Sequence, residues 1–382
     1  MTDDLPHNPA LLPAGLRDLL PPEAETEAAG VATLMRVFAA HGYRRVKPPL
    51  LEFEETLFAG GGAALADQTF RMMDPGTRRM MGLRADMTPQ LARIAATRLS
   101  HAARPLRLSY AGQCLRVDPG QTAPDRQVAQ AGIELIGHDS PEADAEIVVV
   151  GAEALQAVGI IRLSFDLTMP PLVPTLLDEA GFTGEARARL ARALDRKDAA
   201  AVAERGGHLA GTLTDLLLAA GPADRALAAL AAAGLTAGAR AHADRLAETV
   251  AAIRARAPGL VLTVDPVEFR GLRYHTGVCM AVYAPVQHEE LGRGGRYVCG
   301  EAEAATGLTL YPAALLRAAP AMAGMRRVFV PHGADHAAAA ALRAEGFATV
   351  AGLSAASDVM AEARLQGCTH LWQGGSVVPV QE

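Results

Sequence analysis

The chain has 382 residues, of which 50% are hydrophobic and 20% are charged, and its formal net charge is −6. These values are ordinary for a soluble globular protein, and the length allows two or three domains with apolar cores. The negative balance disfavours a large nucleic-acid surface, because phosphate neutralisation needs clustered lysine and arginine.

The four cysteines are scattered and form no CxxC pair, so neither a disulfide framework nor a metal site is expected. No cofactor is expected either. Residues 1–10 carry no signal-peptide pattern, and the longest apolar run, 226–237, is too short to span a bilayer. We therefore expect a cytoplasmic protein without membrane association.

The first predicted element is an amphipathic helix over residues 26–41, which ends at Gly42. Residues 43–53 are predicted to be extended, and the prolines within this segment suit an edge or interface strand. The three glycines at 60–62 indicate a loop.

The next segments are strands and helices in alternation. Thr88 is predicted to be the N-cap of a helix, with Pro89 in the first helical position. Strands are predicted at 78–83, 106–110, 114–117 and 128–137, a turn at 118–120, and a helix at 141–158.

The character of the chain then changes, because residues from about 178 to 258 are rich in Ala, Leu and Arg and predict a helical insert. Extended segments are predicted at 261–264 and 276–283, and a glycine-rich turn at 292–295. The overall class predicted is α+β, with an antiparallel sheet and flanking helices in residues 1–320.

Residues 317–327 are predicted to be a linker to a second domain at 326–382. There, short strands and helices alternate, which predicts a small α/β domain with a parallel sheet.

The segment 128–137 carries the most informative local pattern. Gln130, Gly132 and Glu134 share one strand face, whereas Ile133 and Leu135 point the other way. A glycine between an amide and a carboxylate leaves space, and a buried carboxylate suits an ammonium group. The alternative is a glutamate on a solvated sheet face, and the local pattern does not decide between the two.

Two further segments offer polar groups. Arg116 and Arg126 flank the turn at 118–120 and could clamp a carboxylate or phosphate, although surface charges are the alternative. Residues 269–277 are dense in polar side chains. The glycines at 292–295 are only a weak phosphate-loop signal, since no GK[ST] follows them.

In their order along the chain, these segments resemble the histidyl-tRNA synthetase family of class II synthetases. The resemblance is carried by GLRDLLP at 15–21, the motif 1-like segment 41–52, the motif 2-like segment 107–137, RGLRYH at 270–275 and GRGGRY at 292–297. It implies a class II synthetase-like fold, with Pro49 at a homodimer interface.

The resemblance also implies a pocket for L-histidine. Asp86 stands where the family usually has glutamate, and His275 where it usually has tyrosine. The implied histidine-binding residues are Asp86, Thr88, Arg116, Gln130, Glu134, Arg270, Tyr274 and His275, with Arg126 and Tyr297 in a secondary pocket.

The two segments that would bind the nucleotide in this family differ from the family motifs. Leu115-Arg116-Val117-Asp118 stands in place of FRxE, and Tyr311-Pro312-Ala313-Ala314 in place of GLER, whose arginine binds ATP. Loss of a cation opposite a phosphate removes on the order of several kcal/mol of transition-state stabilisation. No catalytic residue is therefore expected.

A synthetase-like chain without these groups resembles the regulatory subunits of ATP phosphoribosyltransferase. That family implies a non-catalytic protein of histidine biosynthesis, in a hetero-octamer with a short catalytic subunit, needed for its activity and for feedback by histidine. The second domain resembles a truncated anticodon-binding domain without a basic stripe, so no tRNA partner is expected. A divergent histidyl-tRNA synthetase and a stand-alone histidine-binding protein are the alternatives.

Overall fold

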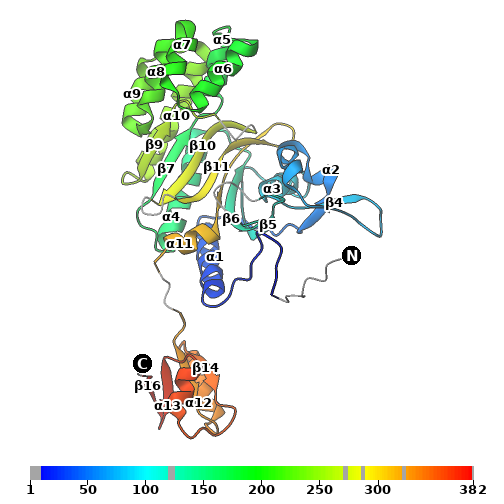
Figure 1. Ribbon diagram of the computed structural model, residues 1–382, viewed down its shortest axis with the longest axis vertical. Coiled ribbons are helices and arrows are strands. Elements are labelled where there is room, and N and C mark those ends of the chain that lie inside the picture. The colour runs from blue at the N-terminus through cyan, green and yellow to red at the C-terminus, as the bar shows by residue number, and fades with distance from the viewer. Residues whose placement is uncertain (1–9, 119–124, 270–273, 285–288, 321–323, 381–382) are drawn as a thin grey trace, which may run out of the picture. The chain divides into compact units, whose positions relative to one another are not determined.

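A nine-stranded sheet forms the centre of the first of two units into which the chain divides, Met1–Pro320 and Ala321–Glu382. The computed structural model describes residues 10–118, 125–269, 274–284, 289–320 and 324–380 (Figure 1). Across the sheet the strands are β1 (Arg44–Arg45), β5 (Leu106–Leu115), β6 (Gln127–Ile136), β12 (Glu303–Leu310), β11 (Glu289–Cys299), β10 (His275–Ala284), β7 (Ser164–Thr168), β9 (Val261–Asp265) and β8 (Gly221–Pro222).

The six long and central strands, from β5 to β7, pair antiparallel, as predicted. Parallel pairs occur only near the ends of the described sheet, between β1 and β5 and between β7 and β9. The fold is therefore α+β with a mainly antiparallel sheet.

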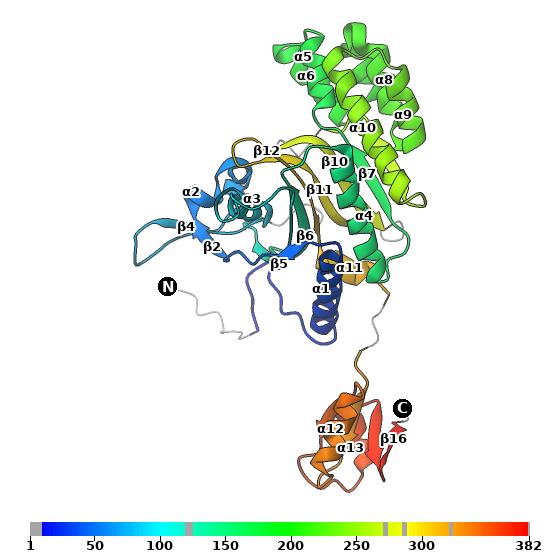
Figure 2. The ribbon, with the colours of Figure 1, turned by 180° about the vertical axis from the view of Figure 1, so that it is seen from behind.

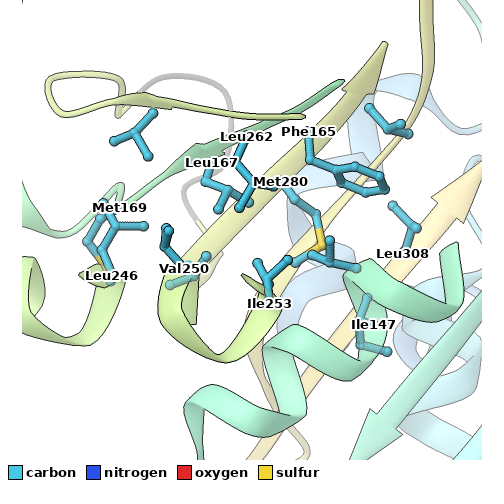
Figure 3. Packing of buried hydrophobic residues seen from close by; sticks show 14 of the residues in the cluster. Ile147, Phe165, Leu167, Met169, Leu246, Val250, Ile253, Leu262, Met280 and Leu308 are labelled. Atoms are coloured by element: carbon cyan, nitrogen blue, oxygen red, sulfur yellow. The ribbon is translucent and has the colours of Figure 1, made fainter. Parts of the chain in front are cut away.

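One face of the sheet is covered by helices α1 (Glu23–Ala40), α4 (Pro141–Ala157) and α10 (Ala237–Arg256), which Figure 2 shows from behind. Apolar side chains alternate along the strands and meet the apolar stripe of each helix. Figure 3 shows this core, where Phe165, Met280 and Leu308 of the sheet pack with Ile147 of α4 and Ile253 of α10.

The opposite face holds α3 (Thr88–Thr97) near β5 and β6, where Leu91 packs with Leu108 and Tyr110 in a second core. A three-stranded sheet lies before α3 in the chain, with strands β2 (Leu51–Phe53), β4 (Met80–Leu83) and β3 (Arg71–Met73). Between them come α2 (Glu54–Leu57) and a 3-10 helix (Gly60–Gln68). The loop predicted at 60–62 was wrong, because these glycines begin that 3-10 helix.

The Ala-rich region folds into helices, as its composition predicts. They are α5 (Leu172–Glu179), α6 (Gly184–Asp195), α7 (Ala199–Arg205), a 3-10 turn (Gly207–Leu209), α8 (Ala210–Ala219), α9 (Ala223–Ala232) and α10. Their leucines join the core of the large sheet, so this region is continuous with the first unit.

Two local predictions were wrong. Thr88 is not an N-cap: Met87 takes that position and Thr88 is the first helical residue, because the Thr88 hydroxyl is bonded to Glu134. The glycines at 292–295 lie inside β11 and not in a turn. A Cβ atom at Gly292 or Gly294 would collide with main-chain oxygens of β12, so glycine allows these strands to pair.

The second unit contains a four-stranded sheet in the order β14-β13-β15-β16. The three parallel strands and both helices occur in the predicted order, but α13 is shorter than predicted and the antiparallel β16 was not predicted. The elements are β13 (Arg327–Val330), α12 (His336–Ala344), β14 (Ala348–Ala351), α13 (Val359–Leu365), β15 (His370–Gln373) and β16 (Ser376–Pro379). The predicted linker begins inside α11 (Pro312–Ala318) of the first unit.

Among the described residues, no helix is long and apolar enough to cross a membrane. The same part of the chain contains no group of three His, Cys, Asp or Glu side chains arranged to hold a metal ion.

Candidate ligand-binding site

Gln130, Gly132 and Glu134 share the face of β6 that points away from the core of Figure 3, as predicted. Their neighbours Ile133 and Leu135 lie in that core. The strand alternation alone places the amide and the carboxylate side by side.

The space over Gly132 is filled by the protein itself. Tyr110 of β5 pairs with Gly132 of β6. Its ring lies over the glycine, and its hydroxyl is 2.6 Å from Thr309 Oγ1 on β12. A Cβ atom at Gly132 would collide with the Tyr110 hydroxyl. The interpretation that this glycine leaves space for a ligand was therefore wrong: it leaves space for the tyrosine.

Glu134 is 1% exposed and both of its carboxyl oxygens are engaged. The hydroxyl of Thr88 donates to Oε1 and that of Tyr297 donates to Oε2, each at 3.0 Å. Gly307 faces the carboxyl group from β12, and a Cβ atom there would collide with it. The alternative of a solvated glutamate was wrong, because this carboxyl group is enclosed by α3, β11 and β12.

Burial raises the pKa of Glu134 to about 8, against the lowering effect of the hydrogen bonds from Tyr297 and Thr88. The charge of Asp86 raises this pKa further. A pKa in this range favours the neutral carboxyl group at pH 7, and a cation placed beside it would favour the ionised form.

Gln130 connects Glu134's neighbours into one network. Its Oε1 accepts from the Met87 amide at 3.0 Å, and its Nε2 donates to Asp86 Oδ2 at 2.8 Å. Asp86 Oδ1 accepts from the Thr88 amide at 2.9 Å. A continuous chain of hydrogen bonds thus joins four of the residues predicted to bind histidine: Asp86, Thr88, Gln130 and Glu134.

Cys114 is a member of this network that the sequence did not predict. Its Sγ donates to Gln130 Oε1 at 3.2 Å. Burial raises the pKa of the Cys114 thiol, and the charge of Asp86 raises it further, so the thiol stays protonated as a donor.

Three ring side chains, Tyr274, His275 and Tyr297, lie together beside Glu134. His275 on β10 is opposite Tyr297 on β11, and the rings of Tyr274 and His275 lie 4.0 Å apart. Tyr274 also meets Tyr297 edge to face at 6.4 Å. Tyr297, expected in a secondary pocket, is thus bonded directly to Glu134. Arg270 lies outside the described residues.

The two arginines at the turn have different surroundings. Arg116 is half-buried and its Nε donates to the Ala85 carbonyl, next to Asp86. The guanidinium of Arg126 lies over the Phe70 ring at 4.6 Å and donates to the Arg116 carbonyl. Arg116 is therefore at the site, and Arg126 holds the main chain beside it.

Arg84 was missed by the sequence reasoning. It is 7% exposed, and it donates to the carbonyls of Gln113 at 2.8 Å and Pro48 at 3.1 Å. Arg84 therefore ties the segment before Asp86 to the segment of Pro49. No local pattern marks it, since its partners are distant main-chain oxygens.

Tyr311, at the position of the missing motif 3 glycine, belongs to the same region. Burial raises the pKa of its hydroxyl, the charges of Arg293 and Arg116 lower it, and those of Glu290 and Asp86 raise it. The side chain thus lies within electrostatic range of both Asp86 and Arg116. Its half-buried ring packs against the core of the large sheet.

Arg296 has a structural role. It is 5% exposed and its NH2 group lies 2.8 Å from Oδ1 of Asp144, which is fully buried at the start of α4. Further donors of Arg296 bind the carbonyls of His138 and Ser140. This buried pair fixes β11 to α4, on the strand face opposite to Tyr297.

The antiparallel sheet, the helix α3 beside it and the polar network between them define a class II aminoacyl-tRNA synthetase-like protein. The sequence profile described as "Histidyl-tRNA synthetase" matches residues 15–315. A histidyl-tRNA synthetase from a Nostoc species shares the fold, with a TM-score of 0.79 at 18% identity over 94% of this chain and 90% of that one.

Relatives with higher sequence identity identify the family more narrowly. The ATP phosphoribosyltransferase regulatory subunit of Gluconobacter oxydans is 56% identical over 97% of both chains, and that of Paramagnetospirillum magneticum is 54% identical over 98% of this chain and 99% of its own. A Bacillus halodurans protein described as an ATP phosphoribosyltransferase regulatory subunit/histidyl-tRNA synthetase has a TM-score of 0.80 at 25% identity, over 93% of this chain and 96% of that one. The chain belongs to the family of ATP phosphoribosyltransferase regulatory subunits.

Proposed function

We propose that the chain is a non-catalytic subunit that binds histidine and controls a separate catalytic subunit of ATP phosphoribosyltransferase, at the first step of histidine biosynthesis. The catalytic subunit would need this chain for activity, and histidine would exert feedback by binding two states of the complex with different affinity. The names of the relatives support the partnership, and the network around Glu134 supports the ligand.

The observation that carries the proposal is the donor and acceptor set of the site. Asp86 and Glu134 are two carboxyl groups within one hydrogen-bond network, and Arg116 is beside them. Histidine offers the complementary groups: an ammonium, a basic ring and one carboxylate. Each charged group of the ligand would therefore find an opposite charge, which makes such contacts strong.

The nucleotide side supports a role without aminoacyl-adenylate chemistry. Tyr311 brings bulk into range of Asp86 and Arg116, and α11 begins at once with Pro312. The segment supplies no cation to neutralise a phosphate there. Because phosphoryl chemistry depends on such charges, amino-acid binding would not proceed to activation.

The ligand is tested by calorimetry with Glu134→Ala and the matched variant Glu248→Ala, on the exposed face of α10. We expect histidine to bind the wild type and Glu248→Ala equally and Glu134→Ala not at all. Unchanged affinity of Glu134→Ala would place histidine elsewhere.

The function is tested by adding the chain to the purified catalytic subunit and assaying phosphoribosyl transfer. We expect activation that histidine reverses, and no histidine-dependent exchange of pyrophosphate into ATP by the chain alone. Robust exchange would indicate a divergent synthetase. A chain that binds histidine without activating the catalytic subunit would be a stand-alone binding protein.

We also propose that two copies of this chain pair through the segment of Pro49 inside the hetero-octamer. Pro49 is exposed and is followed by Leu50, which is 47% exposed. Arg84 and Gln90 both donate to the Pro49 carbonyl and so hold this segment in place. The charge substitution Leu50→Asp should dissociate the pair in sedimentation experiments, whereas an unchanged sedimentation coefficient would contradict this interface.

A further inference from the structure

A groove of about 590 Å³ runs along the outer side of α4. A second hollow of about 510 Å³ adjoins it and shares Val149 and Arg256 with it. We call the two together the α4 groove. Its lining includes residues from α4, from the loop before β7, and from the loop between α10 and β9.

The rim of the α4 groove exposes aliphatic side chains. Ile161 is 79% exposed and Val261 is 58% exposed. They belong to adjacent segments, because Val261 pairs with Ser164 in the parallel ladder of β7 and β9. Exposed aliphatic residues beside a groove mark a surface that another molecule covers.

The carboxylates within the α4 groove are already paired. Arg107 binds both oxygens of Glu146 at 2.7 and 2.8 Å, and His41 lies 2.7 Å from Glu153. These acids are therefore not available to attract a basic partner.

In contrast to these carboxylates, two arginines on the rim of the α4 groove have no ion-pair partner among the described residues. They are Arg162 and Arg256, and both are exposed. Arg256 donates to the Glu142 carbonyl, and its charge lowers the pKa of the Glu142 and Glu146 carboxyl groups. The α4 groove thus has an aliphatic rim beside Arg162, which has no ion pair among the described residues, and Arg256, whose charge is partly offset, and this surface is complementary to carboxylates on an occupant.

The α4 groove and the ligand site lie on opposite sides of the large sheet, and α4 is linked to the site through β11. Asp144, in the first turn of α4, pairs with Arg296, and the next residue, Tyr297, donates to Glu134. An occupant of the α4 groove would contact α4 about one and a half to two and a half turns further along, at Val149 and Glu153, and would leave the ligand site uncovered.

We propose that the α4 groove is the docking surface for the catalytic subunit, and that it takes a segment in which aliphatic side chains are flanked by carboxylates. This inference rests on the proposed function. The aliphatic side chains would pack against Ile161 and Val261, and the carboxylates would pair with Arg162 and Arg256.

The test measures the affinity of the purified chain for the catalytic subunit of the same organism by surface plasmon resonance. Ile161→Asp and Arg256→Glu should each weaken binding about tenfold or more, because a buried apolar or paired contact is replaced by repulsion. The matched control is Leu218→Asp on α8, where the leucine is 63% exposed, and it should leave the affinity unchanged. Histidine binding to each isolated variant, measured by calorimetry, should equal that of the wild type.

The outcomes separate this inference from the proposed function. A wild-type chain that does not bind the catalytic subunit would overturn both. If the wild type binds and Ile161→Asp and Arg256→Glu bind equally well, the inference alone is wrong. Loss of self-association by Ile161→Asp, with the catalytic subunit still bound, would assign the α4 groove to a second copy of this chain and overturn the inference.

Discussion

The neutral state of Glu134 can be tested without any ligand, by replacing it with glutamine. Glutamine has nearly the shape of the protonated glutamic acid and cannot ionise; its amide oxygen accepts from one of the two hydroxyls of Thr88 and Tyr297, and its NH2 group donates to the oxygen of the other. Burial raises the pKa of Glu134 from its ordinary value of 4.5 to about 8. In the unfolded chain the carboxyl group returns to the ordinary value.

The sign of the pH effect follows from proton binding. Between pH 4.5 and 8 the folded chain holds a proton on Glu134 that the unfolded chain has lost, so the free energy of unfolding falls as pH rises. The full shift corresponds to about 5 kcal/mol. Between pH 6 and pH 9 the part of the free energy of unfolding contributed by Glu134 changes by about 3 kcal/mol.

Urea denaturation of the wild type and of Glu134→Gln at pH 6, 7, 8 and 9 measures this difference directly. All other titrating groups are common to both chains and cancel. We expect the free energy of unfolding of Glu134→Gln, relative to that of the wild type, to rise by about 3 kcal/mol between pH 6 and pH 9. Glu248→Gln serves as the control. Parallel pH profiles for the wild type and Glu134→Gln would refute the argument, since Glu134 would then be ionised in the folded chain.

Three further substitutions test the surroundings of the site. Arg296→Met removes the main partner of the buried Asp144 and leaves it the weaker contact with Arg245 at 3.7 Å, so urea denaturation should show a loss of about 3 kcal/mol, and adding Asp144→Asn should recover part of it. Gly307→Ala places a methyl group against the Glu134 carboxyl group; we expect a lower melting temperature and at least about a tenfold loss of histidine affinity, and an unchanged affinity would speak against this contact. Arg84→Met removes the donors that hold the Pro49 segment; denaturation should show a loss of about 1–3 kcal/mol and sedimentation a weaker homodimer.

Short-range periodicity was enough to predict much of the site strand. Gln130 and Glu134 lie on one face because strand alternation is a property of the backbone, which holds wherever the strand is placed. The same reasoning predicted α1 and α4 within a few residues at each end. These features depend on local spacing alone.

Long-range contacts decided the positions where prediction failed. Thr88 has a side chain suited to capping a helix, but Glu134, 46 residues away, takes its hydroxyl. Gly292 and Gly294 have the local signature of a turn, yet they pair within a strand because β12 lies too close for any side chain. Nothing near Gly132 in the sequence indicates that Tyr110 would fill the space above it.

The burial of Glu134 is compatible with binding a cation, because the free energy needed to ionise it is modest at pH 7. With a pKa of about 8, ionisation at that pH requires only about 1 kcal/mol. A charge-assisted hydrogen bond to an ammonium or imidazolium in an enclosed site contributes about 1.5–3 kcal/mol, so a cationic ligand offsets that requirement. A neutral analogue gains no such contact, and Glu134 would keep its proton. Under the proposed function, the site would therefore favour a cationic ligand over a neutral one of the same shape, which is the property that a sensor of a basic amino acid needs.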